Sequence, residues 1–372
     1  MRIGITCHPT YGGSGIVATE LGMELALRGH QVHFITYANP IRLQPDTPGI
    51  HYHEVKVAPY PLFQHQPYTL ALASRMSEVA VRYGLDLLHV HYAIPHSVSA
   101  YLAKQILEPA TRLPVVTTLH GTDITLVGIE QVYFPITRYA IENSDGITAI
   151  SHHLAERTRE VFEISRPIRV IPNFVNCDLY RPDPAKKDRP QGEKTLIHIS
   201  NFRKVKRATD CVRILHEVRR RIPARLLMVG DGPKVGAAEQ LAAEIEVSHA
   251  VDFLGSQLRV DQILPSADVL LLPSEMESFG LVALEGMACG VPAVATRTGG
   301  VPELISDGVD GFLAAVGDIP GQAKRVVRLL SDSQLYEKMS AAARNTAKEK
   351  FDTSQIIPQY ERYYEELCER TN

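Results

Sequence analysis

Short runs of apolar, often β-branched residues alternate along the chain with longer stretches in which apolar residues recur every three or four positions. This alternation predicts strands separated by helices, and therefore βαβ units with parallel sheets. Two series of strands are predicted. The first comprises Arg2 to Cys7, Gln31 to Thr36, Ile50 to Val57, Asp86 to His91, Val115 to Leu119, Gly146 to Ile150 and Ile168 to Ile171. The second comprises Thr195 to Ile199, Arg225 to Val229, Val251 to Leu254, Val269 to Leu272 and Ala293 to Ala295.

The segment from Tyr180 to Gly192 separates the two series. Proline, glycine and charged residues replace the apolar periodicity there, which predicts a linker between two domains. A last amphipathic stretch, Thr353 to Glu369, follows the end of the second series. The pattern alone does not assign that stretch to either domain.

Composition and charge narrow the class of protein. The 372 residues include 39 basic and 42 acidic side chains, a formal net charge of -3, which argues against a wide nucleic-acid surface. The opening residues lack the pattern of a secretory signal, and apolar runs such as Val269 to Leu272 fall far short of the ~20 residues that span a bilayer. We therefore expect a cytoplasmic protein that does not bind membranes. Its five scattered cysteines contain no C-x-x-C and predict free thiols.

A glycine-rich turn follows the first predicted strand. The run from Gly13 to Ala18 fits G-x-G-x-x-A at the start of a helix, where backbone N–H groups can approach an anion. A dinucleotide site would need an acidic residue at the end of the second strand, but no acidic residue follows Tyr37 until Asp46. An anionic or hydroxylated ligand is favoured, and a purely structural turn stays open.

Histidines mark the carboxyl ends of two further strands in the first series. His120-Gly-Thr-Asp123 follows a strand, where either side chain could bind a sugar hydroxyl; in the alternative, Asp123 caps the next segment. His89 and His91 lie two residues apart and so share one face of a strand. No third metal ligand is evident, which favours packed histidines over a metal site.

A cationic turn opens the second series. Four cations in five positions, between Arg203 and Arg207, follow a strand and precede a helix. Such a turn suits a diphosphate, although a solvated basic surface is the alternative. A second glycine turn, at Gly230 to Gly232, follows the next strand.

Two glutamates eight residues apart stand in the most informative segment, Pro273 to Pro292. Glu277 lies in a turn after a strand, and a helix is expected to begin over Ser278 to Gly280 and to contain Glu285. On one unbroken helix the two carboxylates would lie about 12 Å apart along the axis. They would therefore hold two parts of an extended ligand, with N–H groups near the helix start facing an anion between them.

Together these motifs resemble those of the retaining glycosyltransferases of family 4, which have the GT-B architecture. The pattern that carries the resemblance is E-x(7)-E within E-S-F-G-L-V-x-L-E-x-M-A-C-G-x-P, followed by T-G-G-V-P-E and joined to G-G-S-G and H-G-T-D. The likeness covers essentially the whole chain. It implies an α/β protein with two Rossmann-like, doubly wound parallel-sheet domains facing a central cleft. Residues 1–172 plus 353–372 would form the acceptor domain and residues 173–352 the nucleotide-sugar domain.

The resemblance also implies substrates and residue roles. The donor would be UDP-N-acetylglucosamine (UDP-GlcNAc) and the acceptor the hydroxyl of L-malate, in the first step of bacillithiol biosynthesis. Donor-side roles fall to Glu285 at the ribose, Glu277 at the sugar, Arg203 and Lys206 at the diphosphate, Arg259 at the uracil, and Asn201, Ser278, Phe279 and Gly280 nearby. Acceptor-side candidates are Gly13, Ser14, Tyr92, Thr118 and Arg42, with His120 at the reacting atoms. Asn201 stands where other family members have arginine, and Arg203 is the expected substitute.

The expected reaction displaces UDP by the acceptor hydroxyl on the same face of the sugar, without an enzymic nucleophile. No cofactor and no metal are expected, because no D-x-D occurs in the sequence. Three alternatives stay open: a family 4 transferase with another acceptor, a UDP-sugar epimerase, and a non-catalytic nucleotide-sugar sensor. The sequence does not fix the oligomeric state, and a homo-oligomer is compatible with it.

Overall fold

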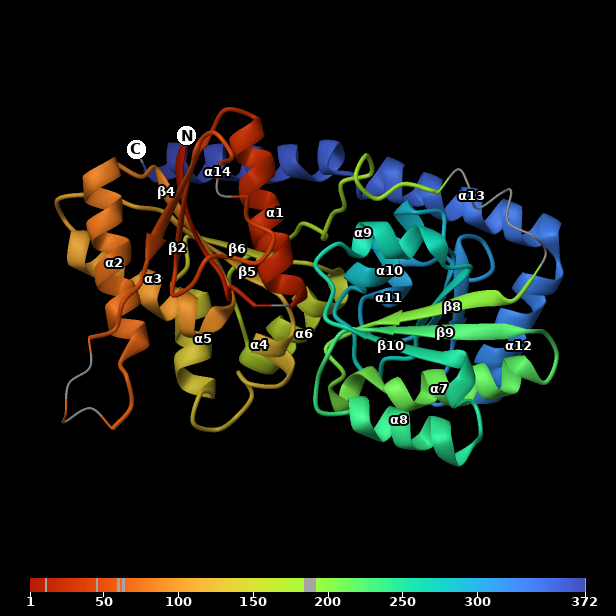
Figure 1. Cartoon of the computed structure of the whole chain (residues 1–372). Helices are drawn as coiled ribbons and strands as arrows, with labels where there is room; N and C mark the ends of the chain where they lie inside the picture. The colour runs from red at the N-terminus through yellow and green to blue at the C-terminus, as the bar shows by residue number, and fades with distance from the viewer. Residues whose placement is uncertain (11, 45, 59–60, 62–63, 184–191, 372) are drawn as a thin grey trace. The chain divides into compact units, whose positions relative to one another are not determined.

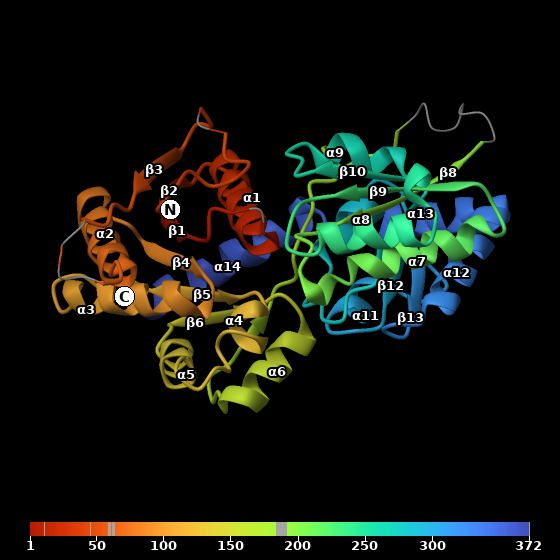
Figure 2. The same ribbon diagram turned by 60° about the horizontal axis from the view of Figure 1, so that its bottom comes forward.

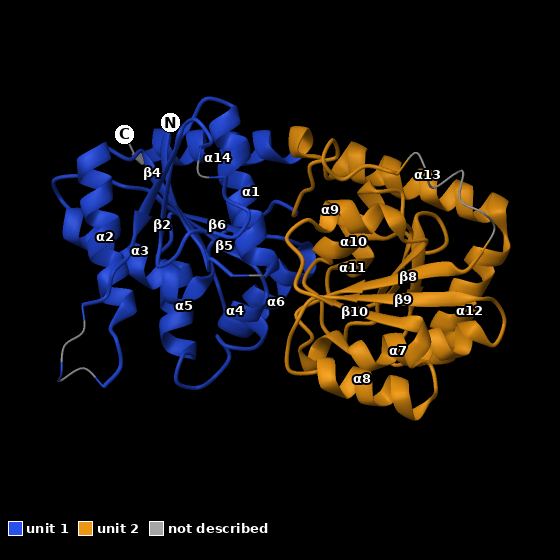
Figure 3. Ribbon diagram, viewed as in Figure 1, with its two compact units in different colours: residues 1–172, 356–372 blue, residues 173–355 orange. Residues whose placement is uncertain are grey.

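Two compact units make up the computed structural model (Figure 3), which describes residues 1–10, 12–44, 46–58, 61, 64–183 and 192–371. Unit 1 contains residues 1–172 and 356–372, and unit 2 contains residues 173–355. Each unit is built on one sheet, and all pairings between the described strands are parallel.

Unit 1 has a seven-stranded sheet in the order β3-β2-β1-β4-β5-β6-β7. Its elements are β1 (Arg2–Thr6), α1 (Gly13–Leu27), β2 (Gln31–Thr36), β3 (Ile50–Glu54), α2 (Tyr68–Tyr83), β4 (Leu87–His91), the short turn η1 (Ala93–Ser97), α3 (Val98–Leu107), β5 (Val115–Leu119), α4 (Thr122–Thr125), α5 (Phe134–Glu142), β6 (Gly146–Ala149), α6 (His152–Phe162), β7 (Arg169–Val170) and most of α14 (Thr353–Thr371).

The alternation of side chains along β4 divides the core of unit 1 between the two faces of the sheet. Leu88 and Val90 pack with the apolar faces of α2 and α3. His89 points to the other face, where its ring lies beside Tyr360 and Tyr364 of α14. The last helix of the chain therefore lies among the first elements, as its blue ribbon beside the red and orange strands shows (Figures 1 and 2).

Unit 2 has a six-stranded sheet in the order β10-β9-β8-β11-β12-β13. Its elements are β8 (Lys194–Ile199), η3 (Lys204–Lys206), α7 (Ala208–Arg219), β9 (Ala224–Val229), α8 (Val235–Glu244), η4 (Ser248–Ala250), β10 (Val251–Gly255), α9 (Val260–Ile263), η5 (Leu264–Ser266), β11 (Val269–Leu272), α10 (Leu281–Ala288), β12 (Ala293–Thr296), α11 (Val301–Leu304), β13 (Gly311–Ala314), α12 (Ile319–Ser331) and α13 (Ser333–Lys350).

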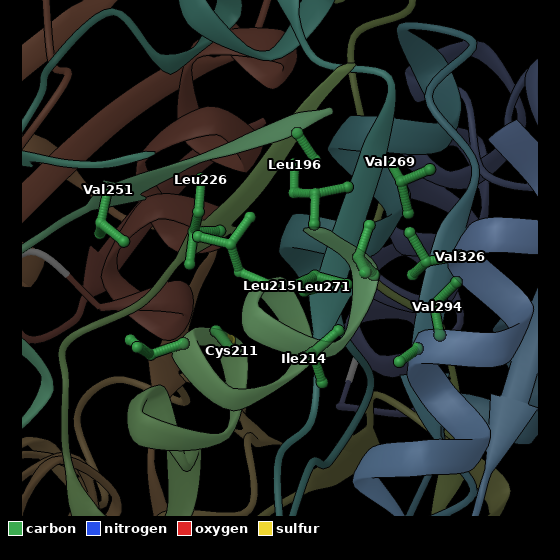
Figure 4. Packing of buried hydrophobic residues seen from close by; sticks show 14 of the residues in the cluster. Leu196, Cys211, Ile214, Leu215, Leu226, Val251, Val269, Leu271, Val294 and Val326 are labelled. Atoms are coloured by element: carbon green, nitrogen blue, oxygen red, sulfur yellow. The ribbon is translucent and has the colours of Figure 1, made fainter. Parts of the chain in front are cut away.

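The core of unit 2 lies between its sheet and the helices α7, α8 and α12 (Figure 4). Every second residue of the central strands points into it, as Val269 and Leu271 of β11 do. From α7, Cys211 and Ile214 meet these strands and are fully buried. Burial of this apolar surface fixes the strand ends that carry the functional side chains.

The order of strands reverses at one point in each sheet. In unit 1, β2 and β3 lie on one side of β1, and β4 to β7 lie on the other. In unit 2, β9 and β10 lie on one side of β8, and β11 to β13 on the other. Loops diverge at such a reversal, and α/β proteins bind ligands there, at the carboxyl ends of the strands.

The predicted fold class, two Rossmann-like domains with parallel sheets, is confirmed. The prediction was wrong in three details. It missed β13, it extended β3 to Val57 although the strand ends at Glu54, and it started a helix at Ser278 although α10 begins at Leu281. The predicted linker was also misplaced: the chain passes from unit 1 to unit 2 between residues 172 and 173, Tyr180 is buried within unit 2, and residues 184–191 lie outside the described part of the chain.

Candidate functional site

An ion pair marks the point where the sheet of unit 2 reverses. Lys206 lies on η3 after β8, and Glu277 lies in the turn after β11. The Lys206 Nζ atom is 2.6 Å from Glu277 Oε2, and the Ser274 hydroxyl donates a hydrogen bond to the same oxygen over 3.3 Å. Only 19% and 14% of the two side chains are exposed. A cation and a carboxylate thus lie at the carboxyl ends of β8 and β11, where the strand order reverses and α/β proteins typically bind ligands.

The turn after β12 fixes the backbone of Glu277. The N–H of Gly300 donates to the Glu277 carbonyl over 3.0 Å, and Gly299 has a φ of +54°. A Cβ atom on Gly299 would lie 1.8 Å from that carbonyl oxygen. Only glycine allows this approach, so the T-G-G motif supports the position of Glu277.

Two glycines hold the cationic turn against the end of β9. Added Cβ atoms on Gly230 and Gly232 would lie 1.9 Å from the Ser200 carbonyl oxygen and 2.0 Å from the Asn201 carbonyl oxygen. Phe202, which is fully buried, accepts a hydrogen bond from the N–H of Lys234 over 3.0 Å at its carbonyl. The turn that carries the cations is therefore rigidly packed.

The cations of this turn have different partners. Arg207 binds the buried carboxylate of Asp210 over 2.5 Å, which is a structural role. Arg203 Nε donates to Asn201 Oδ1 over 3.4 Å, and Arg203 remains partly exposed. Asn201 thus orients Arg203, the residue expected to replace the family's arginine. The contacts of Arg203 and Lys206 with a diphosphate stay predictions.

His198 connects the cationic turn to β11. Its Nδ1 lies 3.0 Å from the Leu271 carbonyl oxygen and must donate, so Nε2 accepts from the Ser200 hydroxyl over 2.9 Å. The Ser200 oxygen in turn accepts from the N–H of Phe202 over 3.1 Å. Burial lowers the pKa of His198 to about 4, so the ring is neutral and adds no charge to the site.

Glu285 lies on α10 and is 5% exposed. Its Oε1 accepts a hydrogen bond from the Tyr180 hydroxyl over 2.9 Å. Gly280, with a φ of +94°, precedes the helix, and Phe279 is buried with its ring 5.7 Å from that of Phe351. The buried ring anchors the turn from which α10 starts, and Ser278 is partly buried in the same turn.

Arg259 follows the end of β10 and is more exposed than Lys206, Glu277 and Glu285. Its guanidinium donates two hydrogen bonds to Asp261, of 2.9 and 2.7 Å, and 61% of its side chain is exposed. The hydrogen bond to the Asp261 carboxylate raises the pKa of Arg259. A planar cation held in this way is suited to stacking on a base.

In unit 1, the His120 loop is clamped by a buried carboxylate. Asp123 accepts hydrogen bonds from the backbone N–H groups of Ala93, His120 and Gly121, over 3.0, 3.2 and 2.8 Å. Burial raises the pKa of Asp123, while these donors oppose the shift. Asp123 lies within α4 and is not its N-cap residue, so the alternative in which it caps that segment is wrong; its hydrogen bonds tie η1 to the end of β5.

Aromatic rings gather around His120. Its Nε2 lies 2.8 Å from His91 Nδ1, and its ring stacks on that of Tyr92 with centroids 5.7 Å apart. His8, after β1, lies edge-on to Tyr92 at 5.0 Å and beside His96 at 4.4 Å. Burial lowers the pKa of His120 to about 3, so its ring is neutral at physiological pH.

The other predicted acceptor-side residues occupy different settings. Gly13 and Ser14 form the first turn of α1, close to β1 because a Cβ atom on Gly15 would lie 2.3 Å from the His8 carbonyl oxygen. Thr118 is fully buried and hydrogen-bonds His89 and Thr148, both over 2.6 Å. Arg42 pairs with Glu20 over 2.6 Å. The ligand contacts of these residues stay predictions.

Two contacts of the site had not been predicted. Tyr180, which binds Glu285, stands in the segment interpreted as a linker, where no local signal marks it. The hydrogen bond between His91 and His120 joins the ends of β4 and β5, and the register of these two strands cannot be derived from the sequence. The one related signal in the sequence was the alternation that placed His89 and His91 on the same face of a strand.

The described residues contain neither a metal-binding cluster nor a helix that could cross a membrane. Among the described residues, no group of three or more His, Cys, Asp or Glu side chains is arranged to hold a metal ion. Within the same part of the chain, no helix combines the length and apolarity that a membrane crossing requires.

Comparison with known proteins identifies the family. A model described as "Glycosyltransferase Family 4" matches residues 11–179, and one described as "Glycosyl transferases group 1" matches residues 181–346. The chain belongs to the glycosyltransferases of family 4, in agreement with the resemblance of its motifs. Among its relatives is the N-acetyl-alpha-D-glucosaminyl L-malate synthase of Bacillus anthracis, which is 47% identical over 378 residues, covering 100% of this chain and 99% of the relative.

More distant proteins share the architecture. The D-inositol 3-phosphate glycosyltransferase of Nocardia farcinica is 27% identical and covers 89% of this chain and 80% of its own. Sucrose-phosphate synthase from Thermosynechococcus elongatus has a TM-score of 0.81 at 20% identity, covering 98% of both chains. HepE of Anabaena in complex with UDP and glucose has a TM-score of 0.79 at 20% identity, covering 98% and 100%. These two solved structures show the fold.

Proposed function

We propose that this glycosyltransferase moves N-acetylglucosamine from UDP-GlcNAc to the hydroxyl of L-malate with retention of the α configuration. One observation carries the proposal: a relative named for the synthesis of N-acetyl-α-D-glucosaminyl L-malate matches the chain from end to end at 47% identity. The charges at the reversal point of unit 2 support a donor that combines a diphosphate with a sugar.

The donor would be held by the side chains of unit 2. Lys206 has three N–H donors, and one of them binds Glu277 in the described part of the chain, so the ammonium group can also donate to diphosphate oxygens. Arg203 would add a second cation, and Arg259 would stack on the uracil. Glu277 would bind sugar hydroxyls, and Glu285 the ribose. This division gives each glutamate one part of an extended molecule.

The acceptor would be held by unit 1. Malate carries two carboxylates, and the N–H groups in the first turn of α1, near Gly13 and Ser14, suit one of them. Tyr92, Thr118 and Arg42 would complete the pocket. His120 would offer a neutral hydrogen-bonding ring beside the reacting atoms, because burial keeps its pKa at about 3.

The chemistry then needs no covalent enzyme intermediate. The bond between the anomeric carbon and the β-phosphate oxygen breaks as the malate hydroxyl oxygen bonds to the same carbon on the same face. The hydroxyl proton passes to the departing phosphate oxygen, so UDP leaves. Arg203 and Lys206 would stabilise the negative charge that grows on that oxygen. No metal is required in this scheme.

The test is the release of UDP from UDP-GlcNAc with L-malate, with L-lactate, with a panel of other hydroxy acids and sugar phosphates, and with no acceptor. L-Lactate keeps the hydroxyl but lacks one carboxylate, so unmatched donors should lower its kcat/KM by roughly 5- to 150-fold. NMR of the product should show the small coupling of an α anomeric proton. Equal kcat/KM for both acids would refute the dicarboxylate pocket, and a β product would refute retention. Interconversion of the UDP-sugar without acceptor would indicate an epimerase. Absence of turnover with every acceptor would indicate a nucleotide-sugar sensor.

A further inference from the structure

Tyr180 is a buried tyrosine that contacts one of the two glutamates of unit 2. It is 2% exposed, and its hydroxyl donates to Glu285 Oε1 over 2.9 Å. The two residues are 105 positions apart in the sequence, so the contact depends on the tertiary fold. Tyr180 follows the start of unit 2, whereas Glu285 lies on α10.

Arg344 of α13 fixes the backbone that carries Tyr180. Its Nη1 donates to the Tyr180 carbonyl over 2.6 Å and also to the Ala288 carbonyl at the end of α10. Its Nη2 donates to the Cys177 carbonyl over 2.8 Å. One guanidinium thus ties the tyrosine segment to the helix that bears Glu285. These hydrogen bonds of Arg344 fix the position of the Tyr180 hydroxyl relative to the Glu285 carboxylate.

A carboxylate binds a diol more tightly when its orientation is fixed before the ligand arrives. A glutamate side chain loses rotamer freedom when it binds a ligand, and this loss of entropy weakens binding. A hydrogen bond from a rigid phenol to one oxygen orients the carboxylate plane in advance, and each carboxylate oxygen can accept more than one hydrogen bond. Hydrogen bonds to charged groups are also the stronger kind.

We propose that Tyr180 is a positioning residue for nucleotide binding: it holds the carboxylate of Glu285 in the orientation that accepts the ribose hydroxyls of the donor. The inference rests on the proposed role of Glu285 at the ribose. Tyr180 itself acts through Glu285 and does not touch the reacting atoms. Its contribution is the same in the ground state and the transition state, so it affects donor KM and leaves kcat unchanged.

The decisive variant is Tyr180→Phe, which keeps the ring and removes only the hydroxyl. Calorimetry would compare the binding of two probes, UDP and 2′,3′-dideoxy-UDP, which lacks both ribose hydroxyls. We expect Tyr180→Phe to weaken the binding of UDP by roughly 10- to 150-fold, the range of one hydrogen bond to a charged group. The affinity for the dideoxy analogue should change by less than about twofold, because the analogue has no ribose hydroxyl that could donate to Glu285.

A matched control is Tyr68→Phe in unit 1. The Tyr68 hydroxyl is buried and has no partner among the described residues, so its removal should leave the binding of both probes unchanged. A second variant, Arg344→Lys, loosens the Tyr180 backbone and should reproduce the selective loss of UDP affinity. It gives an independent test should Tyr180→Phe fail to fold.

The outcomes separate this inference from the proposed function. If Glu285→Gln weakens UDP selectively and Tyr180→Phe does not, Tyr180 has no positioning role. If Tyr180→Phe weakens both probes equally, its role is structural and the inference is overturned. If Glu285→Gln itself spares UDP, the ribose role of Glu285 fails. The expected pattern also includes no further loss when Tyr180→Phe is added to Glu285→Gln.

Discussion

Replacing Gly299 by alanine should displace Glu277 without touching any functional side chain. The new Cβ atom would lie 1.8 Å from the Glu277 carbonyl oxygen, whereas real Cβ contacts essentially never fall below 3.0 Å. One of the two backbones must therefore move by more than 1 Å. A misplacement of about 1 Å at reacting groups costs on the order of 100-fold in rate. We expect kcat/KM of Gly299→Ala to fall by about that factor, with a stability loss of about 1 to 2 kcal/mol for the left-handed alanine.

Gly308→Ala is a control that separates the strain of a left-handed alanine from the displacement of Glu277. Gly308 also has a positive φ, +79°, but no atom lies within 4 Å of its added Cβ. This control should lose similar stability and keep its activity. The assay is the initial rate of UDP release at 25 °C, with the folded fraction of each variant measured by thermal unfolding. Equal rates for the two variants, corrected for folded fraction, would refute the claim that the turn after β12 positions Glu277.

Three further outcomes are expected. Turnover should persist in enzyme treated with EDTA, since cationic side chains supply the charge compensation; loss of activity that Mg²⁺ or Mn²⁺ restores would contradict this. Glu285→Gln should weaken UDP binding in calorimetry, whereas Glu277→Gln should weaken UDP-GlcNAc and spare UDP; an equal loss of UDP affinity would refute the division of roles. Burial lowers the pKa of both His33 and His53 to about 4. Because unfolded histidine titrates near 6.5, the stability they provide is complete above that pH and falls as the pH drops toward 4. Urea unfolding at pH 7.0 and 5.5 should show the decrease, and an unchanged free energy of unfolding would argue against it.

The architecture could be predicted because strands and helices alternate with distinct periods. Buried strands such as β11 are continuous apolar runs, and their ends fall at one edge of the sheet whatever the helices between them do. That is why Lys206 and Glu277, 71 residues apart, could be assigned to one site. β13 was missed because Gly311–Ala314 begins with glycine and contains no β-branched residue, unlike the equally short β11 and β12.

Other features depend on contacts that no local pattern encodes. The start of α10 was placed too early because Ser278 resembles a helix cap, while the positive φ of Gly280 delays the helix to Leu281. Tyr180 was assigned to a linker by the prolines that follow it. Its burial beside Glu285 is decided by α13, whose Arg344 binds the backbone of both segments. The partners of a side chain across 105 residues are a property of the folded chain.

The return of α14 to unit 1 has a consequence for biosynthesis. The strands of unit 1 leave the ribosome first, yet the tyrosines that cover His89 and bind the N–H of Ile147 belong to the last turns of the chain. Unit 2 is complete in sequence while unit 1 still lacks part of its core. The strands of unit 1 therefore stay partly uncovered on one face of their sheet until α14 has been translated. A nascent chain stalled or cleaved before Thr353 would carry an intact sequence for unit 2 and an unfinished unit 1, the part on which chaperones and proteases would act.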